Sequence, residues 1–321
     1  MDALKRIRPD SFFLSHFHAD HYNGLFGVGP NEKFGIVRVF YPRLPVFSER
    51  KEFMVAMLAV SNRVLGGITG SQEADFLNQI RLLARGTCKY RALSKGDVVE
   101  IGGSHFEVLW PPEMLELEAT LSKVRKAIKD FETALEEDSV LKQIDKRVRE
   151  GKVVEEYLRN NSDQFLFPER EIETDLKRPA PPDALPKAVL NANKSLRDAA
   201  NHMSLALYED NRLLFLGDLE KHELKEVVKD LALKRRTNFL ATVTPHHGTH
   251  WHSTLGQIQT HYAISSAGEK LIGHFCQEFK SFGAHCLVTH SNGDIHVSNP
   301  FLSRAFEPTP PYRCGRGFWT L

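Results

Sequence analysis

The amino-acid sequence predicts an α/β protein with a helical segment inserted between its two halves. Three observations lead to this prediction. Short apolar runs separated by turn residues alternate with amphipathic stretches in the first and last thirds of the chain. Residues 113–150 instead carry apolar side chains at alternating spacings of four and three, which is typical of packed helices. A histidine-rich motif directly follows the first apolar run.

The composition is that of a globular protein. With 321 residues, the chain can form one large domain or two ordinary ones, and its 41% hydrophobic residues suffice for a full core. The formal net charge of +1 neither favours nor excludes nucleic acid as a partner. No apolar stretch approaches the ~18 residues of a membrane span. The four cysteines have no CxxC spacing, so we expect free thiols, a cytoplasmic location and no thiolate metal site.

The first half of the chain predicts strands and two helices. An apolar run at 12–14 reads as a buried strand, and a second strand is expected over 36–41. Helices are expected over 45–64 and 72–84. Residues 87–110 show short strand patterns with turns between them. Residues 1–112 are therefore predicted to be the N-terminal half of an α/β domain.

Residues 113–190 are predicted to be a helical insertion and linker. The apolar seam breaks near Asp138 and resumes at Leu141, which predicts a second helix folded back on the first. The proline-rich tract at 178–182 predicts a loop. We expect a self-contained hairpin, so that excising 115–180 leaves the metal site intact, because every proposed ligand lies outside this segment. A homodimer zipper, a protein-partner surface or an oligonucleotide-binding arm within 113–150 are the alternatives.

Residues 191–321 return to the α/β pattern. Strands are predicted over 204–208 and 212–216, a helix over 219–231, and another strand over 237–243. We therefore expect the C-terminal half of the domain here.

The most informative residues are those of the motif His16-Phe17-His18-Ala19-Asp20-His21. His16 and His18 are two positions apart, so on an extended chain they share a face and can chelate one metal ion. Asp20 and His21 come where the chain must turn, and are expected to face a second metal beside the first. Histidine and carboxylate ligands favour zinc, with manganese or iron as alternatives.

Further candidate ligands follow predicted strands in the second half. Asp218 comes at a strand end, which alone is weak evidence because such a residue is commonly a cap. Four histidines fall within seven positions from His246, and we expect one to be a ligand. Alternation along an extended chain predicts that this ligand is His246 rather than His247. His202, just before a strand, is a further candidate.

The order of these motifs resembles the metallo-β-lactamase superfamily, and more narrowly the metallo-β-lactamase domain of competence-type DNA-uptake proteins. The segments around His16 and His202 are also similar to those of DNA cross-link repair nucleases. The resemblance covers nearly everything outside 113–190. It rests on residues 14–21, 93–97, 109–112, 201–205, 216–218, 245–248, 264–268, 273–274 and 283–295.

The resemblance implies a four-layer αββα sandwich with two metal ions at one edge. Residues 1–112 and 191–321 would be its two halves. Only about ten residues precede the Phe12 strand, whereas the family begins with two or more strands, so we expect the N-terminal strands to be missing. The implied ligands are His16, His18 and His202 for site one, and Asp20, His21 and His246 for site two, with Asp218 bridging.

Such a centre implies hydrolysis. Two metal ions ~3.5–4 Å apart share a hydroxide formed at neutral pH and stabilise charge on the attacked group. Asp20 or a neighbouring histidine would exchange protons. His247, Ser266 and His274 are candidates for holding substrate or protonating the leaving group.

Three functions agree with these motifs. The resemblance favours a phosphodiesterase or nuclease that uses two zinc ions and acts on DNA or RNA. The alternative is hydrolysis of a small ester, thioester, lactone or phosphoester, which a deep narrow pocket would favour. The third is a non-catalytic partner protein in which the helical segment makes the interaction. Metal content separates this last reading from the other two.

Overall fold

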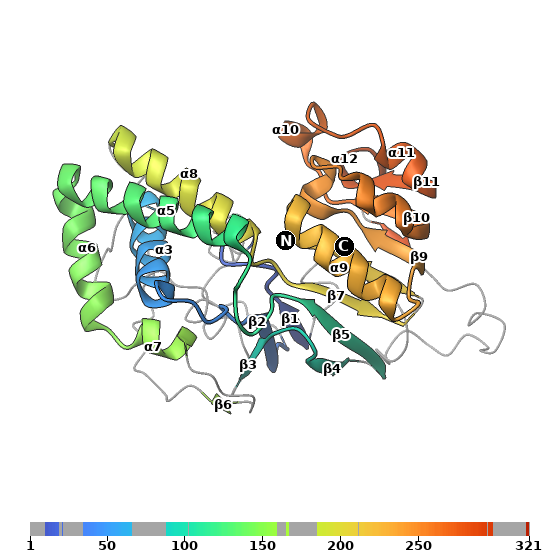
Figure 1. Ribbon diagram of the computed structural model, residues 1–321, viewed down its shortest axis with the longest axis horizontal. Coiled ribbons are helices and arrows are strands. Elements are labelled where there is room, and N and C mark those ends of the chain that lie inside the picture. The colour runs from blue at the N-terminus through green and yellow to red at the C-terminus, as the bar shows by residue number, and fades with distance from the viewer. Residues whose placement is uncertain are drawn as a thin grey trace. The chain divides into compact units, whose positions relative to one another are not determined.

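A computed structural model describes most of the chain in two compact units. The described residues are 10–18, 21, 35–65, 88–101, 103–158, 185–210, 212–293 and 295, with the backbone of 165–166, 296–297 and 319–320. Unit 1 comprises residues 1–93 and 112–203, and unit 2 comprises residues 94–111 and 204–321. Each unit contains a sheet and helices (Figure 1). The predicted α/β class is therefore confirmed.

Unit 1 contains a four-stranded sheet in the order β1-β2-β3-β6. Its strands are β1 (Ser11–Phe13), β2 (Arg38–Pro42), β3 (Lys89–Leu93) and β6 (Phe165–Leu166). The first three strands are parallel, and β6 pairs antiparallel with β3. Buried side chains such as Val39 and Tyr41 fit the continuous apolar pattern of parallel strands. The first histidine motif therefore begins just beyond the carboxyl end of β1.

Five helices of unit 1 are described. They are α3 (Arg50–Val64), α5 (Glu118–Glu137), α6 (Ser139–Glu150), α7 (Val153–Leu158) and α8 (Lys187–Asn201). Helix α5 packs along α8, and α3 packs against α5, α6 and α8 (Figure 1). The helix predicted over 45–64 is confirmed from Arg50 onward, and the one predicted over 72–84 lies outside the described residues.

The helices within 113–158 are part of the core of unit 1 rather than a self-contained hairpin. Val124 and Phe131 of α5 and Leu141 of α6 belong to one hydrophobic cluster with Leu14 and Tyr41. The apolar seam predicted from the heptad spacing is thus buried, but α3 and α8 cover it together with α6. Heptad spacing identifies an apolar helix face and leaves open which helix covers that face.

The predicted break between the two helices is a capped helix start. Asp138 is buried, and its Oδ1 accepts hydrogen bonds from the backbone N–H groups of Val140 and Leu141, both at 2.9 Å. Its Oδ2 accepts a hydrogen bond from Arg63 Nε at 2.8 Å. One carboxylate thus begins α6 and joins it to α3, because Arg63 lies in the last turn of α3.

Unit 2 contains a seven-stranded mixed sheet in the order β11-β10-β9-β8-β7-β5-β4. Strands β8, β9, β10 and β11 are parallel, whereas β4, β5 and β7 pair antiparallel with their neighbours. The strands are β4 (Val98–Ile101), β5 (Ser104–Trp110), β7 (Ala206–Glu209), β8 (Leu213–Phe215), β9 (Asn238–Val243), β10 (Gln259–Ser265) and β11 (Gly283–Val288). The strands predicted from the sequence in this part of the chain are therefore confirmed.

Short helices connect the parallel strands of unit 2. Helix α9 (Lys221–Leu233) joins β8 to β9, as predicted over 219–231. The other connecting helices are η2 (Pro245–Gly248), η3 (Ser253–Gln257), α10 (Glu269–Ile272) and α11 (Phe279–Phe282), whereas α12 (Thr289–Asn292) follows β11. Strands β12 (His296–Val297) and β13 (Trp319–Thr320) form a separate pair.

The parallel strands place several candidate residues at one edge of the sheet in unit 2. Asp218 follows β8, the His246 turn follows β9, and Ser266 follows β10. Because the carboxyl ends of neighbouring parallel strands lie side by side, these three segments converge.

Among the helices that the structure describes, none is long and apolar enough to cross a membrane.

Candidate functional site

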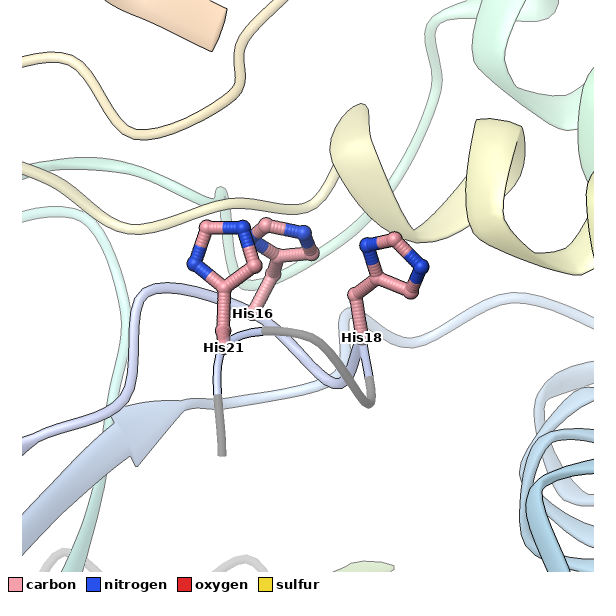
Figure 2. A group of neighbouring side chains, drawn as sticks. All are labelled: His16, His18 and His21. Carbon is pink, nitrogen blue, oxygen red and sulfur yellow. The ribbon is translucent and has the colours of Figure 1, made fainter. Parts of the chain in front are cut away.

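Three histidines of unit 1 gather in the loop that follows β1. The ligand nitrogens of His16, His18 and His21 lie within 4.8 Å of one another. The ring centroids of His16 and His21 are 4.0 Å apart, and Figure 2 shows the three rings on the same side of the loop. His16 and His18 are 1% and 6% exposed. Three imidazoles this close, two of them buried, can hold a metal ion.

This group is made by a turn and not by a strand. Strand β1 ends at Phe13, so His16 and His18 do not lie on the extended chain from which their common direction was predicted. The backbone N–H of His21 donates to the carbonyl oxygen of His18 at 3.0 Å and closes a tight turn. This turn returns the chain so that the His21 ring lies beside that of His16.

A serine hydroxyl orients two of the three rings. Ser15 Oγ lies 3.1 Å from His16 Nδ1 and 2.9 Å from His21 Nδ1. Its single proton can be donated to only one ring, so the other imidazole must donate from Nδ1 to Oγ. That ring carries its lone pair on Nε2, which is the tautomer of a histidine that binds metal through Nε2. Ser15 is not among the site residues predicted from the sequence, although its position directly before the HxH pattern is the available signal.

Two other predicted metal ligands, His202 and Asp20, are not part of this histidine group. His202 is buried at the C-terminal end of α8, in the same unit, but it is not a member of the group formed by His16, His18 and His21. Asp20 lies outside the described residues. His18 also lines a small pocket whose other residues come from α3, α8 and the loop itself, namely Phe17, Met57, Val60, Ser61, Asn193, Leu196 and Arg197.

Asp218 and His247 face each other in unit 2. His247 Nδ1 lies 2.9 Å from the carbonyl oxygen of Ser266, which can only accept, so this nitrogen carries the proton. The lone pair of the ring is then on Nε2, which lies 3.5 Å from Asp218 Oδ2. Asp218 is buried. Two electron-pair donors that approach this closely are stabilised by a cation between them, or by a second proton on the ring.

The two adjacent histidines occupy a strained turn. His246 and His247 have φ values of 48° and 58°, in the left-handed region that costs a non-glycine residue about 1–3 kcal/mol. The turn is held because His246 N–H donates to the Gly217 carbonyl at 3.0 Å and Thr249 Oγ1 donates to the His246 carbonyl at 2.7 Å. The chain is not extended here, so the alternation that selected His246 over His247 does not apply. The structure directs His247 towards Asp218.

The other histidines of the cluster have separate surroundings. His246 Nδ1 lies 3.1 Å from Glu220 Oε1, and His250 Nδ1 lies 3.8 Å from the same oxygen. His252 accepts a hydrogen bond from the backbone N–H of Thr254 at 3.2 Å and caps η3. Partial burial, followed by the charges of Lys225 and Lys221, lowers the pKa of His252. His252 is therefore a structural cap of η3.

The two predicted substrate-binding residues contribute differently from expectation. Ser266 is exposed, and its backbone carbonyl accepts the hydrogen bond that orients His247. His274 is exposed between α10 and α11. It belongs to none of the clusters of metal-ligating side chains that the described residues form.

The close packing at Gly217 gives a testable prediction. Gly217 has φ +52°, and a Cβ there would lie 2.7 Å from Ser204 Cβ and 2.8 Å from the Leu205 carbonyl oxygen. We expect Gly217→Ala to lower the free energy of unfolding by about 2–4 kcal/mol, because backbone strain and overlap add. Gly96→Ala is the matched control, since Gly96 has φ +91° with nothing within 4 Å and should cost only about 1 kcal/mol. Equal losses in urea unfolding would show that overlap at Gly217 is not important.

The donor chemistry of these groups fits a borderline divalent cation such as zinc. Imidazole nitrogens and carboxylate oxygens are typical zinc ligands, and a ring that donates a hydrogen bond from Nδ1, as His247 does, has the required tautomer. Histidine and carboxylate clusters of this chain can therefore bind a metal ion. No protein-family model, curated protein or solved structure matches the chain.

Proposed function

We propose that this protein is a metal-dependent hydrolase of phosphodiesters, with DNA or RNA as its substrate class. We further propose the four-layer αββα arrangement of the metallo-β-lactamase superfamily for its fold. The observation that carries the proposal is the orientation of histidine rings through Nδ1. Ser15 orients a ring of the first motif and the Ser266 carbonyl orients His247, so that Nε2 lone pairs are available for metal.

Each unit contributes one set of ligands in this proposal. The first set consists of His16, His18 and His21. Two further ligands, Asp20 and the buried His202, are retained from the resemblance. Asp218 and His247 form the second set, so His247 replaces His246 as the ligand. The resemblance implies two zinc ions, with manganese or iron as alternatives. When bound, such ions lower the pKa of water to ~7 and neutralise charge on an attacked phosphoryl oxygen.

The protein's own groups have distinct tasks in the reaction. Ser15 and the Ser266 carbonyl keep histidine rings in the correct tautomer, which saves reorganisation when substrate binds. The carboxylate of Asp218, buried beside His247, supplies fixed negative charge and can accept a hydrogen bond from the attacking water. Asp20 keeps its predicted role as proton acceptor.

Metal analysis coupled to a substrate panel tests this proposal. Purified full-length protein would be analysed for bound metal and assayed with zinc or manganese on bis(p-nitrophenyl) phosphate, single- and double-stranded DNA, RNA, a thioester and a lactone. We expect at least two equivalents of metal and hydrolysis of phosphodiesters that a chelator abolishes. His16→Ala should lose both properties, whereas His105→Ala, which changes an exposed histidine of β5, should retain them.

Two other results would replace the proposal. Turnover confined to the thioester or lactone would assign the chain to hydrolysis of small esters. Absence of bound metal in the wild-type protein, even after incubation with zinc, would favour the non-catalytic partner function.

A further inference from the structure

We propose that Glu220, His246 and His250 form an additional metal site in unit 2, separate from Asp218 and His247. The ligand atoms of these three side chains lie within 4.8 Å of one another. Glu220 Oε1 is 3.1 Å from His246 Nδ1 and 3.8 Å from His250 Nδ1, and the two ring centroids are 4.1 Å apart. Two imidazoles thus converge on a single carboxylate oxygen.

The distances are those of ligands around one small cation. Zinc binds nitrogen and oxygen at ~2.0–2.1 Å with tetrahedral angles, so neighbouring ligand atoms lie ~3.3–3.4 Å apart. The two distances at Glu220 Oε1, 3.1 and 3.8 Å, bracket this value. A hydrogen bond alone would account for the contact with His246, but 3.8 Å is too long for a hydrogen bond to His250. A shared cation explains both approaches at once.

The backbone directs these side chains to the same place. Glu220 occupies the N-cap position of α9, but its carboxylate does not cap the helix. The left-handed conformation of His246 turns its ring towards Glu220, while His247, in the same turn, faces Asp218. Asp218 therefore pairs with His247, and Glu220 pairs with His246. His250 joins the second pair.

The ligand set indicates the chemistry of this site. Two neutral imidazoles and one carboxylate suit zinc or a similar borderline divalent ion, and they leave one position for solvent or another ligand. The side chain of His250 is 49% exposed, so solvent reaches that position. The site is independent of the proposed hydrolysis, because neither Glu220 nor His250 belongs to the proposed catalytic set.

Metal titration of the full-length protein tests this site. Zn²⁺ would be titrated calorimetrically into metal-stripped protein, and Co²⁺ would serve as a spectroscopic probe of tetrahedral histidine ligation. We expect Glu220→Gln and His250→Ala each to remove one equivalent of bound Zn²⁺, or to weaken it at least about tenfold, since even groups that only orient a ligand are worth about 10–100-fold. The corresponding part of the Co²⁺ spectrum should disappear.

Matched controls are available on another exposed histidine–carboxylate pair. His105 Nε2 and Glu100 Oε2 are 3.9 Å apart, so His105→Ala and Glu100→Gln change the same residue types at a single pair. These variants should bind as much Zn²⁺ as the wild type. Circular dichroism would verify the fold of each variant, and Glu220→Gln preserves side-chain size.

Metal binding by Glu220, His246 and His250 can be tested separately from the proposed hydrolysis. Unchanged Zn²⁺ stoichiometry and affinity in folded Glu220→Gln and His250→Ala would show an ordinary histidine–glutamate ion pair and overturn the additional site. His16→Ala and Asp218→Ala report separately on the proposed catalytic metals. A loss of metal in these two variants would therefore not support the additional site.

Discussion

Replacing Asp218 with alanine is expected to abolish phosphodiester hydrolysis and to lower metal occupancy. Asp218 is buried, and its Oδ2 lies 3.5 Å from His247 Nε2. Loss of a group that merely orients a metal ligand costs about 10–100-fold in affinity or activity, so loss of a ligand should exceed 100-fold. The measurement is kcat/KM on bis(p-nitrophenyl) phosphate together with bound metal per chain.

Asp210→Ala is the matched control for this prediction. Asp210 is an exposed aspartate of the same unit that pairs with Arg236 at 2.7 Å, and its removal should change neither quantity. Normal turnover and full metal content in Asp218→Ala would remove Asp218 from the site. Hydrolysis should also fall further in His247→Ala than in His246→Ala. The opposite order would restore His246, the residue selected from strand alternation, as the ligand.

Excising residues 115–180 is expected to unfold unit 1 and to remove its metal binding. Helices α5, α6 and α7 bury Val124, Phe131, Leu141 and Tyr157 in the hydrophobic cluster that includes Leu14. Removing one large core side chain costs about 2–5 kcal/mol, so loss of several exceeds the ~5–15 kcal/mol that stabilises a typical domain. Circular dichroism and Zn²⁺ titration of the deletion protein are the measurements.

A direct contact links the helical segment to the histidine loop. Phe17 lies between His16 and His18 in the sequence, and its ring packs edge-to-face on Tyr157 of α7 at 5.3 Å between centroids. Both rings also pack against Tyr41 of β2, each at 6.1 Å. Removing the helices therefore removes part of the support of the loop that presents the histidines.

A graded version of this experiment avoids the deletion. Phe131→Ala should cost about 3–5 kcal/mol of unfolding free energy, whereas Val140→Ala, at a position 44% exposed, should change it by less than about 0.5 kcal/mol. A folded deletion protein with intact metal binding, or equal effects of the two substitutions, would show that the segment is a self-contained hairpin after all.

The sequence by itself determined the secondary structure and the types of metal-ligating residues. Strands such as β9 and helices such as α9 follow from apolar periodicity, which depends on local geometry alone. The histidine motif at 16–21 and the histidine cluster that begins at His246 also predicted imidazole ligands from the sequence alone. These features can be predicted from the sequence because each lies within a short segment.

Only the tertiary structure decided which of these side chains lie close together. The choice between His246 and His247 depends on two left-handed backbone conformations, which alternation along an extended chain cannot anticipate. The grouping of Glu220 with His250 depends on the parallel order of β8 and β9, which aligns segments distant in the sequence. The partner of the heptad seam was decided by long-range packing on α3 and α8, because an apolar helix face is satisfied by any complementary surface.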